Sequence, residues 1–372
     1  MQMWQTKKLG EVLEYEQPTD YIVESKNYKD EYETPVLTAG KSFILGKTKE
    51  KNGIFPALKL PVIIFDDFTT ATKFVDFPFK VKSSAMKILH PIKKISDAKF
   101  LFYMMQTIDF DHTGIHKRYW ISEYSKIEIP LPPIAEQKRT VKILDDTFDK
   151  VVKAKENAEK NFQNSKELFE SYLQDIFSNP GKDWEEKTLG EIVETTQGVQ
   201  IIKGLQLKNP KIGYRRYLYI SDFNHEKNLK YVQDIYPKKL VTPDDLIVVN
   251  TGASAGKIYR GIDGVLSNNL FKVSISKDVL ATDFLYYFVI SNVFKNFQKK
   301  IVRGTANPHM GHENFNLTPF YLPKLSEQKI IVKKLDTLSD ETKKLEGIYF
   351  KKLENLEELK KSILQKAFSG AI

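Results

Sequence analysis

The chain has 372 residues, no cysteine and a formal net charge of +9. The length fits two or three domains, and a hydrophobic content of 41% is enough for real cores. The missing cysteine excludes disulfides, a thiolate nucleophile and a cysteine metal site, while the basic surplus favours an anionic partner, with nucleic acid first and a membrane surface second.

No feature of the sequence marks the chain for export or for a bilayer. No apolar run approaches the roughly 18 residues of a membrane span. The first residues, Met1-Gln2-Met3-Trp4, lack the charged-then-apolar order of a signal peptide. We therefore expect a soluble protein of the cytoplasm.

Residues 1–130 are predicted to form a β-rich block of the α+β class. Apolar and β-branched runs at 60–65, 74–77 and 86–89 are typical of strands. A short helix is expected over 97–109, with Asp97 as its N-cap.

Residues 134–177 are predicted to form one long helix, because they lie between Pro132-Pro133 and Asn179-Pro180-Gly181 and contain no Gly or Pro. At about 1.5 Å per residue the helix would span about 65 Å, which is too long for burial inside one globular domain. Apolar residues in steps of three and four make a heptad seam, which requires a partner helix. The seam residues are Val141, Leu144, Phe148, Val151, Ala158, Phe162, Phe169, Tyr172 and Ile176, with Lys155 and Ser165 in the two gaps.

The second half of the chain repeats the first. The junction Leu-Pro-x-x-x-Glu-Gln-Lys occurs at 131–138 and 322–329, and Leu-Gln-x-x-Phe-Ser occurs at 173–178 and 364–369. Both pairs have the same offset, so no insertion separates the two copies, and Trp-x-x-x-x-Leu-Gly-Glu opens each block at Trp4 and Trp184. In the expected alignment, the strand at 246–249 matches the strand that begins at Val62. The strand at 270–273 matches 85–88, and a helix at 283–297 matches 97–109.

A second long helix, predicted over 325–368, supplies the partner of the first. Its seam is Val332, Leu335, Leu338, Leu345, Tyr349, Leu353, Leu356 and Ile363. Gly347 costs about 1 kcal/mol of helix propensity, which packing offsets. The expected fold is α+β, an internal duplication with pseudo-twofold symmetry. Two β-rich globular domains (1–130 and 180–321) are joined by two long antiparallel helices of a coiled coil (131–179 and 322–372).

The sequence contains no credible active site. The stretch from Gly252 to Ile258 has three residues between its glycines and an Ile after its Lys, whereas a Walker loop needs four residues and a Ser or Thr. A tight turn between strands is the better interpretation. The pair Asp66-Asp67 lacks the downstream Glu-x-Lys of a nuclease, and neither a methyltransferase motif nor a Gly-x-Gly cofactor loop occurs.

The histidines also favour no metal site. His112 and His116, or His309 and His312, have spacings that zinc could use, but no third ligand is evident near either pair. We therefore expect no catalytic residue, no metal and no cofactor bound by this chain.

Basic and polar residues in the predicted loops of both blocks are the observation that favours DNA binding. Lys and Arg neutralise phosphates, while Arg, Asn and Thr can read base edges in the major groove. For any single Lys a solvated surface charge is the simpler interpretation, so the set carries the argument. The candidate DNA contacts of the first block are Lys41, Lys47, Lys49, Thr69, Thr70, Thr72, Lys73, Lys117, Arg118 and Tyr119. Those of the second block are Lys203, Arg215, Arg216, Lys257, Arg260, Asn268, Asn269, Arg303 and Asn307.

Through its two junctions, its two helix ends and its two Trp openings, the chain resembles the specificity subunit of Type I restriction-modification systems. The resemblance covers nearly the whole chain. It implies that each globular block is a target recognition domain for one half of a split double-stranded DNA site, and that the helices fix the gap between the halves. The loops at 66–73 and 250–257 differ, so the target is expected to be asymmetric.

The resemblance also implies partners. Two modification subunits, which bind S-adenosylmethionine and methylate adenine, would bind the helices and the recognition domains. Restriction subunits that use ATP and Mg would join them to cleave unmodified DNA. This chain would recognise the target sequence and would carry out no catalysis. The base contacts of the family vary, so none of them is assigned to residues of this chain.

Three other functions remain open. The chain could be the specificity subunit of a related system with one fused nuclease-methyltransferase partner. It could be a coiled-coil scaffold whose lobes bind proteins, which a lack of salt-sensitive DNA affinity would favour. A metal-dependent nuclease acting alone is the third, and it lacks a motif.

Overall fold

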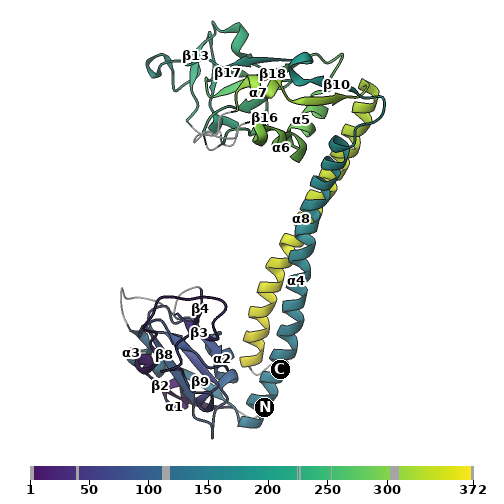
Figure 1. Cartoon of the computed structure of the whole chain (residues 1–372). Helices are drawn as coiled ribbons and strands as arrows, with labels where there is room; N and C mark the ends of the chain where they lie inside the picture. Colours follow the sequence, from purple (N-terminus) through teal and green to yellow (C-terminus); the bar gives the residue numbers. More distant parts are fainter. Residues whose placement is uncertain are drawn as a thin grey trace. The chain divides into compact units, whose positions relative to one another are not determined.

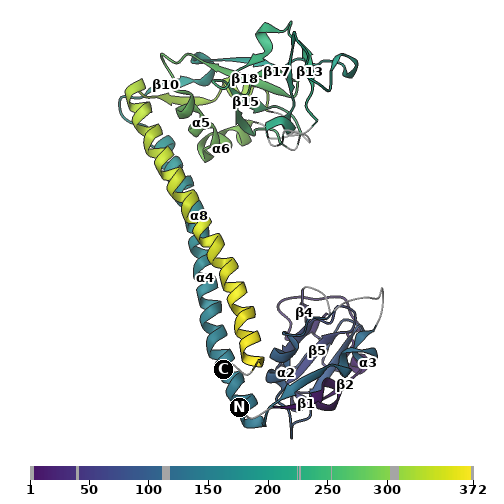
Figure 2. The same cartoon turned by 180° about the vertical axis from the view of Figure 1, so that it is seen from behind.

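The computed structural model describes residues 4–38, 42–110, 118–223, 225, 228–252, 254–301 and 310–369. The chain divides into two compact units, Met1–Ala158 with Lys351–Ile372, and Glu159–Phe350. Each unit holds one globular part and one half of each long helix, α4 (Ile134–Ser178) and α8 (Leu325–Phe368), which lie side by side (Figures 1 and 2). Both predicted long helices are confirmed. The predicted domain boundaries, placed at the helix ends, stay predictions.

The globular part of the first unit contains two small sheets and a terminal strand pair. The strand order of one sheet is β2 (Leu13–Glu16), β8 (Met86–Pro91), β5 (Val62–Asp66) and β6 (Thr72–Val75). The other is β4 (Ile44–Thr48), β3 (Thr34–Leu37) and β7 (Lys80–Val81), and β1 (Gln5–Lys8) pairs with β9 (Glu128–Leu131). The helices are α1 (Leu9–Val12), α2 (Ala98–Met105) and α3 (Tyr119–Ser122). Three-residue or four-residue 3-10 helices lie at Pro18–Tyr21, Ala57–Lys59 and Tyr124–Lys126.

The globular part of the second unit repeats this plan, which confirms the duplication. The strand order of one sheet is β11 (Val193–Gln197), β18 (Leu270–Ile275), β15 (Leu246–Val249) and β16 (Ile258–Arg260). The order of the other is β13 (Tyr231–Gln233), β12 (Tyr214–Leu218), β17 (Gly264–Leu266) and β14 (Leu240–Val241). The strand β10 (Glu185–Thr188) pairs with β19 (Pro319–Leu322). The helices are α5 (Thr282–Ile290), α6 (Asn292–Ile301) and α7 (His312–Asn316). Short 3-10 helices lie at Leu189–Glu191, Lys203–Leu205, Ile220–Phe223 and Pro237–Lys239.

The two predicted short helices differ in how they end. Asp97 is the N-cap of α2, as predicted, because its carboxylate accepts from the amides of Lys99 and Phe100 at 3.0 Å. The helix ends earlier than predicted, at Met105. The helix expected at 283–297 is instead two helices that meet at Ser291. This serine interrupts the helix because its hydroxyl accepts from the amide of Phe294 and so caps α6.

The residue-by-residue match of the central strands was wrong by one position. The side chains of Ile63 and Phe65 in β5 face the core shared with α2, and those of Leu246 and Val248 in β15 face the core shared with α5. Val62 faces the opposite side, so Leu246 corresponds to Ile63. A shift of one residue reverses every side chain of a strand, and an apolar run buried on both faces does not reveal such a shift.

In the first unit the long helices pack antiparallel around the predicted seam. Leu144 and Phe148 of α4 lie in one apolar cluster with Leu364 and Ala367 of α8. Further along α4, Lys155 forms an ion pair of 2.6 Å with Glu357 of α8, which lies earlier in the sequence than Leu364. Lys155, predicted for a gap in the seam, therefore contacts the partner helix, but its side chain is 43% exposed.

In the second unit the seam continues with one correction. Ser165 of α4 is buried, as predicted for a gap position, and Leu335 of α8 is buried in the same core as Leu173 and Phe177. Leu345, by contrast, was predicted in the seam but is 38% exposed. The polar Thr342 takes the buried place, because its hydroxyl donates to the carbonyl of Leu338 at 2.8 Å within its own helix.

The repeated Glu-Gln-Lys junction has a structural cause in the first unit. The side chain of Gln137 is fully buried, and its Nε2 donates to the carbonyls of Ile95 (2.9 Å) and Pro132 (2.8 Å). Its Oε1 accepts from the amide of Asp97 at 2.8 Å. One amide side chain thus joins the start of α4 to the chain that enters α2.

Gln328 makes the same three contacts in the second unit. Its Nε2 donates to the carbonyls of Val279 (2.9 Å) and Pro323 (2.8 Å), and its Oε1 accepts from the amide of Ala281 at 2.7 Å. We call the three contacts of Gln137 and the three contacts of Gln328 the glutamine clips. The two clips orient α2 and α5 alike on the long helices.

A tyrosine also ties each short helix to a long one. Tyr103 donates to Asp145 at 2.6 Å, and Tyr287 donates to Asp336 at 2.5 Å. Burial and the neighbouring carboxylate raise the pKa of both tyrosines, so each hydroxyl keeps its proton. Asp145 and Asp336 have the same sequence offset as the two junctions, so the duplication preserves both acceptors.

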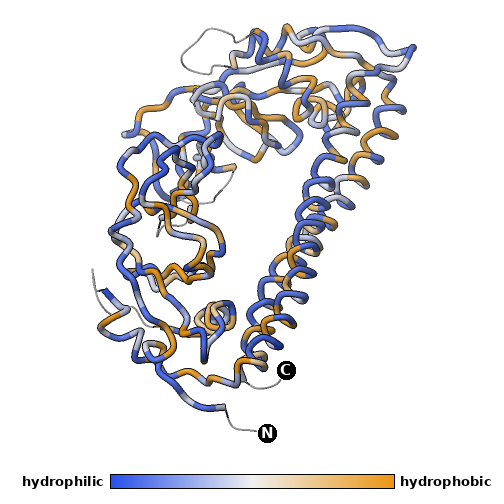
Figure 3. Tube along the Cα trace, turned by 60° about the horizontal axis from the view of Figure 1, so that its bottom comes forward, coloured by the Kyte–Doolittle hydropathy of each residue, from blue (hydrophilic) through white to orange (hydrophobic). Residues whose placement is uncertain are grey.

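Hydrophobic and hydrophilic residues alternate along both long helices, as expected of a paired surface helix (Figure 3). In the part of the chain that the structure describes, no helix is long and apolar enough to cross a bilayer.

Candidate nucleic-acid interface

The turn between β5 and β6 holds two of the predicted DNA contacts, Thr69 and Thr70. The carboxylate of Asp66 accepts from the amides of Phe68 (2.9 Å) and Thr69 (3.3 Å), and its carbonyl accepts from the amide of Thr70 at 2.9 Å. Lys73 follows in β6, exposed, with its ammonium 5.9 Å from the centre of the Phe43 ring. Asp66 therefore stabilises this turn from within.

Thr70 is strained, with a φ of 57°. A β-branched residue at positive φ is an outlier that costs about 1–3 kcal/mol, and such strain gathers at functional sites. The turn thus displays its threonines at some cost in stability.

We expect Thr70→Gly to raise the free energy of unfolding by about 1 kcal/mol, because glycine adopts this φ without a Cβ clash and loses only part of the gain to chain entropy. Urea unfolding measures the effect. Thr69→Gly is the matched control and should be destabilising. A loss of stability in Thr70→Gly would show that the strain does not limit this turn.

Two predicted contacts of the first unit are interior residues. Thr72 is 7% exposed, and its hydroxyl accepts a hydrogen bond of 2.5 Å from Gln106, the residue that follows α2. Tyr119 is 1% exposed and packs against Phe110 at 5.1 Å between ring centres. Neither side chain can reach DNA, because both are buried in the globular part. The neighbouring Arg118 is exposed.

Asp67 fastens α3 to the same turn. Its carbonyl accepts from the amide of Tyr119 and its Oδ1 from the amide of Trp120, both at 2.9 Å. Its Oδ2 lies 3.4 Å from the ammonium of Lys87, and the two side chains are 3% and 1% exposed. The candidate interface of this unit therefore rests on a buried ion pair.

The corresponding turn of the second unit has a different build. Gly252 and Gly256 have φ values of 82° and 84°, which glycine adopts without strain. The carbonyl of Asn250 accepts from the amide of Met310 at 2.9 Å, as the carbonyl of Asp67 accepts from Tyr119. Asn250 therefore occupies the place of Asp67, one residue away from the predicted match.

Three predicted arginine contacts in the second unit are engaged by carboxylates. Arg215 lies 2.6 Å from Asp234, and Arg216 lies 3.4 Å from the buried Asp222. A third pair joins Arg260 to Asp283 of α5 at 2.5 Å. These arginines brace the fold, so they are weaker candidates for DNA contacts than the sequence suggested.

The remaining predicted residues divide into three groups. Lys49, Lys203, Lys257 and Asn269 are exposed, and Lys47 and Asn268 are half-buried. The backbone carbonyl of Asn268 accepts from the side chains of Gln197 and Asn250. Lys41, Lys117, Arg303 and Asn307 lie outside the described residues.

Sequence reasoning missed Lys295 and Gln298 of α6, which line a cavity beside the 252–257 turn. Their available signal was helical spacing, because Gln298 and Lys299 follow Lys295 by three and four residues and so lie near it on α6. Among the residues that the structure describes, no group of three or more histidine, aspartate or glutamate side chains could hold a metal ion.

The whole chain has the fold of solved HsdS subunits. It matches the HsdS subunit from Thermoanaerobacter tengcongensis with a TM-score of 0.63 and 19% identity, over 100% of this chain and 98% of that chain. It also matches a chain from a structure of the type I R-M system, on complex assembly and conformational transition, with a TM-score of 0.75 and 18% identity, over 100% and 99% of the two chains.

The family follows from the sequence comparison. The model of the Type I restriction modification DNA specificity domain matches residues 1–161 and 181–356, one match for each copy of the duplication. The chain belongs to this family.

Curated relatives cover part of the chain. The EcoR124I/EcoR124II specificity subunit of Escherichia coli is 46% identical over 193 residues, which are 50% of this chain and 47% of that protein. The MjaVIII specificity subunit of Methanocaldococcus jannaschii is 27% identical over 191 residues, which are 51% and 43% of the two proteins. The chain thus spans about half the length of these two relatives.

Proposed function

We propose that the chain reads the DNA target of a Type I restriction-modification system, with one half of a split target for each globular part. The supporting observation is the contrast between clips and turns. The glutamine clips at Gln137 and Gln328 have the same geometry, whereas the turns after Asp66 and Val249 differ in sequence and backbone conformation. Like frames with unlike loops suit two different half-sites, so the target is asymmetric.

The contacts with DNA are carried by residues that the structure leaves exposed. In the first unit these are Lys49, Thr69, Lys73 and Arg118, with Thr70 and the half-buried Lys47 beside them. In the second unit they are Lys203, Lys257 and Asn269. The lysines contact phosphates and set affinity, and the side chains on the two turns contact base edges.

The chain is the non-catalytic member of a complex. Modification subunits that bind S-adenosylmethionine would methylate adenine at the site, and restriction subunits would use ATP and Mg, so this chain binds none of these cofactors. Exposed apolar side chains on the long helices, such as Val152 (52%) and Ile348 (60%), support docking of protein partners there. A single fused nuclease-methyltransferase partner is the alternative.

The test is adenine-methylation sequencing of a host that carries this gene with a matching modification subunit. We expect a two-part motif that disappears on deletion of the gene. Exchange of residues 183–321 for those of a relative should change one half of the motif and leave the other half unchanged.

The control is an exchange within the long helices that keeps their length unchanged, and it should preserve both half-sites. A methylation pattern that does not depend on this gene would remove the proposal and favour the protein-scaffold function.

A further inference from the structure

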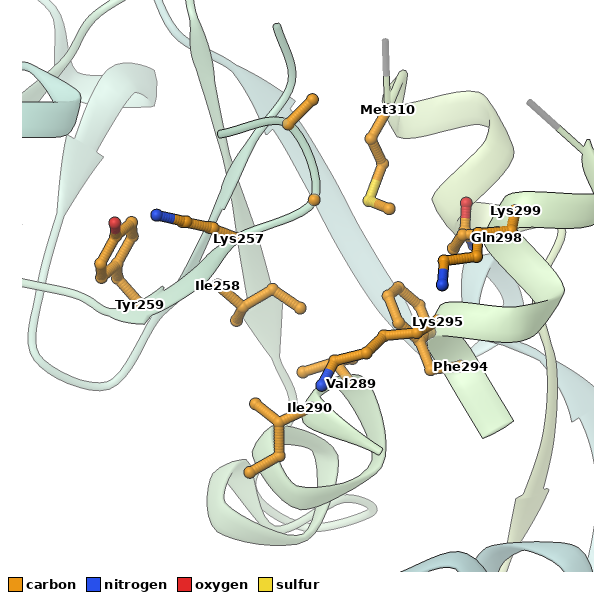
Figure 4. Close-up of a pocket in the computed structure, with 12 residues that line it drawn as sticks. Lys257, Ile258, Tyr259, Val289, Ile290, Phe294, Lys295, Gln298, Lys299 and Met310 are labelled. Carbon is orange, nitrogen blue, oxygen red and sulfur yellow. The ribbon is translucent and has the colours of Figure 1, made fainter. Parts of the chain in front are cut away.

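A cavity of about 450 Å³ lies in the second unit between the 252–257 turn and helix α6. In Figure 4 Ile258 points into it from one side and Phe294 from the other, with Met310 above them. Val289 and Ile290 complete an apolar floor. Cavities of this size with apolar walls commonly hold a small ligand.

The cavity is positively charged. Lys257, Lys295 and Lys299 line it, and among the described residues no aspartate or glutamate does. In Figure 4 the side chain of Lys295 runs across the floor, whereas Lys257 points away from it. None of the three ammonium groups has an ion-pair partner among the described carboxylates. An anionic group at the mouth would therefore be stabilised.

A buried hydrogen-bond acceptor in the cavity wall has no partner. Gln298 is 3% exposed, and its Nε2 donates to the carbonyl of Asn314 (3.3 Å) and the hydroxyl of Thr318 (2.6 Å). Its Oε1 is buried without a partner in the part of the chain that is described. An unpaired buried carbonyl is unfavourable, so a ligand whose N–H group reaches it is stabilised.

We propose that the cavity binds a single nucleotide. The base lies on the apolar floor against Phe294, its exocyclic amine donates to Oε1 of Gln298, and its phosphate lies at Lys295 and Lys299. A flat apolar body, an N–H donor and an anion are the three features that the lining requires, and a nucleotide carries all of them.

The nucleotide can be free, or it can be displaced from a DNA strand held by the adjacent 252–257 turn; only the second source rests on the proposed function. An acidic peptide would satisfy the lysines and could supply a backbone N–H group beside an apolar side chain, so it is the competing occupant in the test. The neighbouring turn, which the proposed function places at DNA, favours a nucleotide.

Equilibrium dialysis with the full chain tests the free ligand. AMP should bind at least about tenfold more tightly than adenosine, which lacks the phosphate, and than ribose 5-phosphate, which lacks the base. The double variant Lys295→Glu/Lys299→Glu should weaken AMP binding about tenfold or more. Lys300→Glu, an exposed charge reversal on the same helix outside the cavity, should leave it unchanged.

A duplex with one unpaired 2-aminopurine tests the strand source. Its emission should change on binding to the chain, and Ile290→Trp, which fills the cavity, should abolish that change while circular dichroism shows a folded protein. AMP binding alone supports a free nucleotide, and a response from the duplex alone supports a displaced one.

Failure of both probes overturns the inference, as does AMP binding that persists in Ile290→Trp. Binding of a tryptophan-containing acidic peptide in place of AMP also overturns it. Methylation sequencing of a host with the unchanged chain separates this result from the proposed function. If that chain directs a two-part motif but binds no nucleotide, only the inference about the cavity is overturned.

Discussion

Replacement of Asp67 by alanine is expected to lower the free energy of unfolding of the first unit by about 3–5 kcal/mol. The variant would leave the ammonium of Lys87, 1% exposed, without its carboxylate. The amide of Trp120 would also lose its acceptor. Denaturant unfolding of the first unit, followed by the fluorescence of the buried Trp120, measures the loss.

The second unit supplies the control for this variant. There the places of Asp67 and Lys87 are taken by Asn250 and Phe271, a neutral pair, in an otherwise similar sheet. The double variant Asp67→Asn/Lys87→Met should therefore cost less than Asp67→Ala, since it removes both charges and keeps an acceptor for Trp120.

Binding to DNA should follow stability in these variants. Asp67 holds α3 against the β5–β6 turn, so on the proposed function its loss should also weaken recognition of one half-site and spare the other. If Asp67→Ala costs less than about 1 kcal/mol, the pair is reached by water and the interpretation of the turn is wrong.

The second large effect is expected at the glutamine clips. Gln137→Ala should destabilise the first unit by about 3 kcal/mol, because three backbone groups lose the buried side chain that they bond and a cavity remains. Gln328→Ala should have a similar effect on the second unit. Native-state hydrogen exchange at the amides of Asp97 and Ala281 reports each clip separately, since each amide donates to one glutamine only.

Lys138→Ala is the matched control for Gln137→Ala, because Lys138 is the adjacent residue of α4 and is exposed. It should change the unfolding free energy by less than about 0.5 kcal/mol. Equal exchange rates at Asp97 in Gln137→Ala and in the parent chain would show that water replaces the clip.

The interface was harder to predict than the helices because it depends on tertiary partners. Arg260 and Lys257 look alike as basic loop residues in the sequence. In the fold, Arg260 faces Asp283 on α5, whereas Lys257 has no carboxylate partner among the described residues. The predicted DNA contacts Tyr119 and Thr72 are buried for a related reason. Elements distant in the sequence pack around them, and no local sequence pattern predicts this burial.

The sequence by itself determined the duplication, the two long helices and their seam, and the family resemblance. These features depend on periodicity and on repeated residues, which are local properties of the chain. Only the tertiary structure decided which face each central strand presents, because strands buried on both sides carry no alternation. It also decided which charges stay exposed and where the cavity forms, because both depend on which distant elements meet.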